Sequence, residues 1–271
     1  MLEAQFGNRV LAEVVERARL AWRARLLGAY ALGSLAHGGF SAQVSDVDVA
    51  LVLEDPLQSG DSATVEQLLQ AVKAGRRPLA DRVSIFWGSP RTLSGAQTGG
   101  RFEPQDLLDL AQYGRLEFGK DLRSQVRLPT RRELVVSSGA FALQRLSTPQ
   151  VLAELRDPAR LARADAKTLT KRVLFPARFL YTARTGEVGI NQRAAEHFAG
   201  SETGPAAELV RQALAWRTAA PQRREQGVAD LLRNGILPLY RVFVGEYEKR
   251  LRAYGELELA QAYLKWRRAL A

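Results

Sequence analysis

The chain has 271 residues, no cysteine, two histidines and a formal net charge of +10, with 46% hydrophobic and 25% charged residues. This is the composition of a folded globular protein, and it excludes disulfides, thiolate zinc sites and a cysteine nucleophile, and leaves little material for a serine-histidine triad. Because the sequence has no apolar run long enough to span a membrane and no visible secretory signal, we expect a cytoplasmic protein without membrane contact.

The first predicted elements are a helix and two strands. Residues 3–25 carry apolar positions at helical spacing, and they lead into an apolar run, 26–32, that ends at Gly33-Ser34. A glycine-bearing loop follows, and a second apolar run covers 45–53. Two strands joined by a tight loop is the simplest interpretation.

Two acids open the second of these strands. Asp46 and Asp48 are two residues apart, and the period of a strand sends such side chains to one face. Neighbouring carboxylates repel each other unless a cation lies between them. Mg²⁺ takes oxygen ligands and keeps waters and substrate phosphates in its other positions, so the pair predicts a magnesium site.

The end of the first strand predicts a phosphate contact. Gly33 lets the backbone come close to a ligand, while Ser34 adds a hydroxyl and an N–H group, and successive N–H groups at such a turn form an anion-binding concavity. His37 follows in the same loop, and the sequence shows no partner for it.

Gly33-Ser34, a spacer and the serine-led pair Asp46-Val47-Asp48 resemble the motif of the DNA polymerase β-type nucleotidyltransferases. Members of this superfamily transfer a nucleoside monophosphate from a nucleoside triphosphate. The resemblance implies that Gly33, Ser34 and Ser45 bind the nucleotide, with ATP as co-substrate. It also implies that Asp46 and Asp48 are catalytic and hold Mg²⁺.

The superfamily carries a third carboxylate on a later strand, as a metal ligand or as the base that deprotonates the acceptor hydroxyl. The predicted strand 79–88 has Ser84 in its central position, and its nearest acid is Asp81. Asp81 is therefore the candidate third catalytic carboxylate, with Glu117 as a weaker one. If the acids share the strand face of Ser84, the base is missing.

Pro129-Thr130 marks the predicted domain boundary, because nearly everything after it has helical patterning. Segments around 169–172, 180–188 and 191–196 resemble the helical domain of streptomycin and spectinomycin adenylyltransferases. We therefore expect an α+β protein, with a nucleotidyltransferase domain of mixed sheet and flanking helices over 1–128 and an all-α bundle over 129–271. The resemblance implies that Lys171, from the helical domain, binds the triphosphate.

The predicted activity is transfer of AMP from ATP, with Mg²⁺, to a hydroxyl of a small acceptor, and an aminoglycoside is the leading example. One alternative is a catalytically degraded nucleotidyltransferase fold that binds or regulates, which Ser84 favours. Another is an enzyme that nucleotidylates RNA or protein. The positive charge suits anionic partners, but no RNA-recognition motif is present, so nucleic acid is not favoured.

Overall fold

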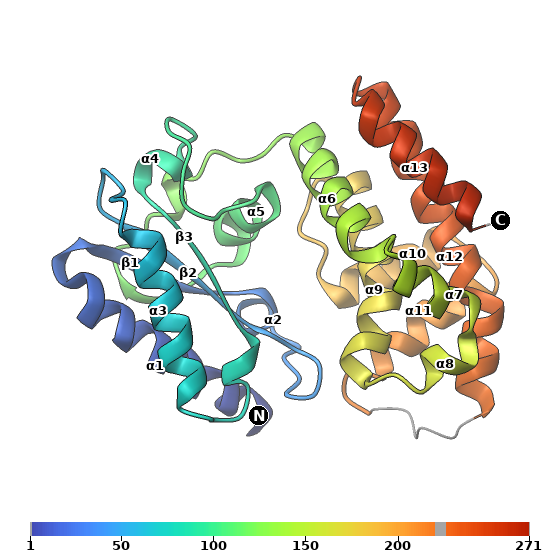
Figure 1. The fold of residues 1–271 in the computed structure, drawn as a ribbon, viewed down its shortest axis with the longest axis horizontal. Coiled ribbons are helices and arrows are strands. Elements are labelled where there is room, and N and C mark those ends of the chain that lie inside the picture. Colours follow the sequence, from blue (N-terminus) through green and yellow to red (C-terminus); the bar gives the residue numbers. More distant parts are fainter. Residues whose placement is uncertain (1, 220–225, 271) are drawn as a thin grey trace. The chain divides into compact units, whose positions relative to one another are not determined.

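The computed structural model describes residues 2–219 and 226–270 and divides the chain into two compact units, Met1–Pro129 and Thr130–Ala271 (Figure 1). The division falls between Pro129 and Thr130. A capping box starts the second unit: Thr130 Oγ1 accepts the Glu133 N–H at 3.2 Å, and Glu133 Oε2 accepts the Thr130 N–H at 2.7 Å. These bonds satisfy N–H groups that a helix start leaves open, so a helix begins at Arg131.

The first unit alternates helices and strands, and it confirms the predicted α+β class. Its elements are α1 (Leu2–Trp22), β1 (Leu26–Leu32), α2 (Gly33–His37), β2 (Val47–Leu53), α3 (Asp61–Ala74), β3 (Val83–Gly88), α4 (Pro90–Leu93), α5 (Pro104–Tyr113) and β4 (Arg115–Gly119), with short 3-10 turns at Arg23–Arg25, Ala80–Arg82 and Arg123–Gln125.

The strands form one four-stranded mixed sheet in the order β3-β2-β1-β4. β1 is antiparallel to β2 and to β4, whereas β2 and β3 are parallel. The register pairs Leu32 with Asp48 and Asp48 with Ser84. The end of β1, the start of β2 and the start of β3 therefore meet at one edge of the sheet.

Two strand predictions need correction at their first residues. β3 begins at Val83 and not at Leu79, because Leu79 has a left-handed backbone (φ 71°) and residues 80–82 form a 3-10 turn. Asp81 consequently lies outside the strand. β2 begins at Val47, so the period of two governs Asp48 but not Asp46.

The two faces of the sheet contact different helices. Alternate β2 residues from Val47 to Leu53 share a cluster with buried residues of α1 and α3, while Ala50 and Val52 share another cluster with Leu110 of α5. Asp48 has the parity of Ala50 and Val52 and so emerges on the face of α5.

A buried ionic group ties the start of α3 to the end of α1. Asp61 is 2% exposed and receives a bidentate pair from Arg25, both bonds at 2.9 Å, as well as the Trp22 indole N–H at 2.9 Å. The Gln58 N–H bonds Asp61 Oδ2 at 2.7 Å. Burial acts to raise the pKa of Asp61, but these hydrogen bonds outweigh it and leave the pKa lowered.

The described part of the second unit contains helices and no strand. They are α6 (Arg131–Leu146), α7 (Pro149–Arg156), α8 (Pro158–Ala162), α9 (Ala166–Thr185), α10 (Asn191–Ser201), α11 (Pro205–Ala215), α12 (Gln226–Ala253) and α13 (Leu257–Ala269). Buried rings of α12 and α13 form much of its core, and Tyr247, fully buried, donates its hydroxyl to the Phe179 carbonyl at 3.0 Å.

Across the described ranges of both units, no helix has the length and apolar character needed to cross a membrane.

Candidate active site

The turn after β1 is shaped by a glycine that touches the acid of the next strand. Gly33 has φ of 60°, a conformation that strains any side chain. A Cβ built on Gly33 would clash with Asp48 Oδ2. Only glycine lets the turn lie directly against the Asp48 carboxylate, and Ser34 follows it, half-buried.

The two predicted metal ligands differ in how they are held. Asp48 lies within β2, between Leu32 of β1 and Ser84 of β3, and is half-buried. Asp46 is also half-buried but precedes the strand. The sheet therefore fixes the backbone of Asp48 from both sides, whereas Asp46 depends on the loop before it.

That loop is closed by serines. Ser45 is 5% exposed, its Oγ accepts the Ser41 N–H at 3.0 Å, and its own N–H bonds the Ser41 carbonyl at 2.8 Å. Arg82, the last residue of the 3-10 turn before β3, donates to the carbonyls of Ala42 and Gln43, both at 2.9 Å. The structure thus gives Ser45 a part in holding the loop, and the prediction that it binds nucleotide stays a prediction.

No acid occupies the position beside Asp48 on β3. That position is Ser84, and Asp81 is exposed in the turn before the strand. Glu117, the weaker candidate, is exposed on the edge strand β4 and pairs with Arg115 at 2.6 Å. Asp48 therefore shares its strand face with Ser84 and with no acid of β3, so Asp81 would have to act as the base from the turn before that strand.

Two acids that the sequence analysis missed come from α5. Asp109 accepts the Gly33 N–H at 3.0 Å through Oδ2, and its Oδ1 lies 2.6 Å from His37 Nε2. His37 therefore has the partner that the sequence did not reveal. The available signal was the spacing of Asp106 and Asp109, which places both on one face of a helix that begins at Pro104.

Asp106 lies one turn before Asp109 and caps its own helix by accepting the Glu103 N–H at 2.9 Å. Burial, together with the smaller effects of the charges of Asp48 and Asp109, raises the pKa of Asp106 to about 7 against the effect of that hydrogen bond. The effect of Asp48 on this pKa means that α5 carries an acidic side chain close enough to Asp48 for the two groups to interact.

The donor set suits a magnesium ion that is completed by substrate. Within residues 2–219 and 226–270, no three His, Cys, Asp or Glu side chains come close enough together to hold a metal ion by themselves. Asp46 and Asp48 would supply two carboxylates, and Ser84 adds a hydroxyl at the paired position. Mg²⁺ is commonly bound by one or two carboxylates with waters and phosphates, so these residues fit it.

Lys171 belongs to the second unit. It lies on α9, half-buried, with its ammonium group 5.7 Å from the centroid of the Phe175 ring. This is a cation–π distance, which orients the lysine along the helix face that it shares with Phe175. Its predicted contact with a triphosphate stays a prediction.

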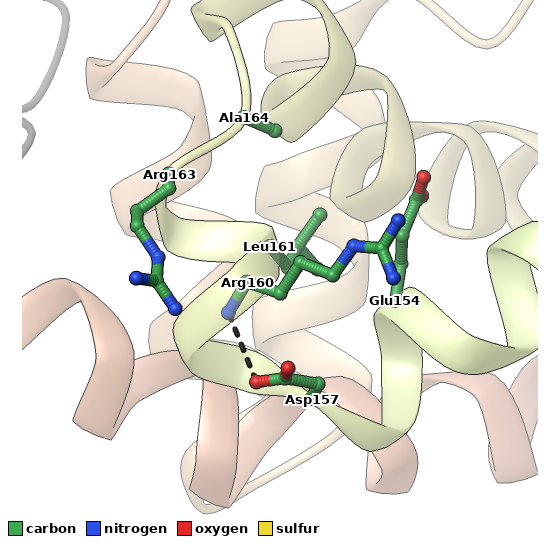
Figure 2. A pocket seen from close by; sticks show the side chains of 6 residues that line it. All are labelled: Glu154, Asp157, Arg160, Leu161, Arg163 and Ala164. Atoms are coloured by element: carbon green, nitrogen blue, oxygen red, sulfur yellow. Dashed lines mark hydrogen bonds between the residues drawn. The ribbon is translucent and has the colours of Figure 1, made fainter.

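A surface pocket of about 280 Å³ also lies in the second unit, but its polar groups serve the local structure. It is lined by Glu154, Asp157, Arg160, Leu161, Arg163 and Ala164. Asp157 accepts the Arg160 N–H at 3.0 Å as the cap of α8, and Glu154 pairs with Arg172 at 2.9 Å. Figure 2 shows the side chains of Arg160 and Arg163 pointing apart, so they do not converge on a ligand. None of the predicted site residues lines this pocket.

No protein-family model matches the sequence, and no curated protein sequence matches it. Among solved structures, the chain is similar to the spectinomycin adenyltransferase AAD(9) from Enterococcus faecialis, determined with ATP and spectinomycin. The TM-score is 0.56 at 16% sequence identity, and the match covers 83% of this chain and 96% of that chain. At this identity the likeness is one of fold: the chain shares its fold with this adenyltransferase, in agreement with the resemblance drawn from the motif around Gly33 and Asp48.

Proposed function

We propose that this chain transfers AMP from ATP, with Mg²⁺, to a hydroxyl group of a small acceptor. The contact of Gly33 with the Asp48 carboxylate supports this most directly. It places a turn that suits phosphate beside a carboxylate that suits a metal, on a fold shared with an adenyltransferase solved with ATP.

Asp46 and Asp48 would hold Mg²⁺, which when bound neutralises phosphate charge and orients the triphosphate. Ser34 would hydrogen-bond the triphosphate, and Lys171 would offset the charge that develops on the leaving pyrophosphate. The acceptor oxygen would form a bond to the α-phosphorus while the bond from that phosphorus to the bridging β-phosphate oxygen breaks. Asp81 is the proposed base for the hydroxyl proton.

The acceptor class is a small hydroxylated molecule. Spectinomycin is bound in the similar structure, which makes aminoglycosides the first compounds to test. A polycationic acceptor would need acidic side chains to face it, yet several acids of the second unit already pair with arginines. Glu202 contacts Arg184 at 3.1 Å, and Glu208 contacts Arg211 at 2.6 Å.

The test is pyrophosphate release with ATP, Mg²⁺ and a panel that includes spectinomycin and streptomycin. We expect acceptor-dependent release from the wild-type chain and none from Asp48→Ala. Glu66→Gln, which removes one exposed charge from α3, is the matched control and should keep wild-type turnover. Release that does not depend on Asp48 would contradict the proposal.

A binding or regulatory module is the second candidate, and the pairing of Asp48 with Ser84 favours it. Such a module would bind a non-hydrolysable ATP analogue with Mg²⁺ but would release no pyrophosphate with any acceptor. Calorimetry with the analogue, performed beside the turnover assay, separates the two functions.

A further inference from the structure

One carboxylate of α5 holds both ends of α2. Asp109 accepts the N–H of Gly33, the first residue of α2, at 3.0 Å, and it lies 2.6 Å from the imidazole of His37, the last residue of α2. A carboxylate only accepts hydrogen bonds, so the imidazole donates through Nε2. Each oxygen of Asp109 therefore has its own partner on α2.

This contact is well shielded. The side chains of His37 and Asp109 are 5% and 15% exposed. The Tyr113 ring meets the imidazole edge-on, with ring centroids 4.9 Å apart. Asp109 and Tyr113 are four residues apart on one face of α5, so this helix contacts His37 through two side chains.

The same contact sets the position of Gly33 relative to Asp48. Gly33 lies so close to the Asp48 carboxylate that no Cβ fits between them. Any shift of the turn toward β2 would meet that carboxylate, and the bond to Asp109 opposes a shift away from α5. Asp109 and Asp48 thus confine Gly33, and with it Ser34, to one position.

Packing alone does not require a carboxylate at position 109, because an apolar residue would fill the same space. A buried carboxylate also costs free energy unless hydrogen-bond donors face it, so its two bonds to α2 need another explanation. We propose that Asp109 is a positioning residue for nucleotide binding, which holds the Gly33–Ser34 turn at its distance from Asp48 through Gly33 and His37. This inference rests on the proposed function, and it adds a residue from a helix that the motif does not include.

The test compares Asp109→Ala and Asp109→Asn with wild type, and Glu66→Gln again serves as the charge-matched control. Calorimetry measures the affinity for a non-hydrolysable ATP analogue with Mg²⁺, and NMR follows the backbone amide of Gly33 in the free protein. The melting temperature of each variant shows whether it is folded.

We expect Asp109→Ala to lower the affinity about tenfold, the scale of losing a group that orients a binding residue, and to move the Gly33 amide proton upfield. Asparagine keeps one oxygen for the Gly33 N–H, so Asp109→Asn should recover part of both effects. A merely structural role would lower the melting temperature without changing the affinity of the folded variant.

Analogue affinity that stays at the wild-type value while the Gly33 amide moves would overturn the inference and leave the proposed function standing. Should Asp109→Ala fail to fold, the same comparison with Asp109→Asn decides. A wild-type chain that binds no nucleotide overturns the proposed function, and the inference with it.

Discussion

Asp48 on β2 and Ser84 on β3 are paired neighbours in a parallel register, and both side chains leave the sheet on the face of α5. The β3 residue that pairs with Asp48, the predicted metal ligand, therefore carries a hydroxyl group. A carboxylate there would place a second negative charge beside Asp48.

The first prediction follows from this pairing. Ser84→Glu should raise the affinity for Mg²⁺ in the presence of the ATP analogue by about tenfold, because ligand charge tunes the affinity for a divalent cation. Without metal, the like charges should lower the melting temperature. Mn²⁺ replaces Mg²⁺ in the measurement, and electron paramagnetic resonance gives its affinity for each variant. Ser84→Gln has the same shape without the charge, and equal affinities in the two variants would refute the prediction.

The second prediction concerns Asp81, which is exposed in the turn before β3. If Asp81 accepts the acceptor proton, Asp81→Asn should lower kcat by about 10²-fold and leave the analogue affinity unchanged, since a general base acts in the transition state. Steady-state kinetics with the best acceptor gives this value. If Asp81→Asn keeps the wild-type kcat, Asp81 is not the base.

The third prediction is a loss of stability at Asp61. Asp61→Asn leaves Arg25 partly buried without its charge partner and should lower the free energy of unfolding by about 3 kcal/mol at neutral pH. Because the folded pKa is lowered below the usual value of 3.8, the stabilisation is present above that pH and is lost as the pH falls through the folded pKa. Urea unfolding followed by circular dichroism at pH 7 and pH 3 tests both statements. An equal loss at the two pH values would contradict the ionic explanation.

The fourth prediction uses the raised pKa of Asp106. In the folded protein the Asp106 carboxyl keeps its proton up to about pH 7, whereas in the unfolded chain it loses the proton near pH 3.8. Asp106 therefore makes the free energy of unfolding fall as the pH rises between these values. Asp106→Asn keeps the hydrogen bond to Glu103 and removes the titration. The melting temperature of Asp106→Asn minus that of wild type should therefore increase from pH 4 to pH 7 and stay constant above pH 7. The melts are measured with EDTA present, and a difference that does not change with pH would contradict the assignment.

Much of the fold was accessible from sequence because its signals are local. The run 26–32, its end at Gly33 and the apolar stretch after Asp48 predicted adjacent strands, and the register of β1 and β2 confirms them. The start of β3 was placed too early because apolar content does not show that Leu79 adopts a left-handed backbone. The loop before β2 likewise contains a five-residue helix, which its glycines gave no reason to expect.

By itself, the sequence predicted which residues would carry the chemistry of the motif, since glycine, serine and paired aspartates are read from identity and spacing along one short stretch. The tertiary structure alone decided what surrounds them. Asp109 lies 76 residues from Gly33, and Ser84 lies on a strand whose register with β2 no local pattern fixes. Such partners depend on how a helix packs on a sheet and how strands align, and these contacts form only when distant segments come together.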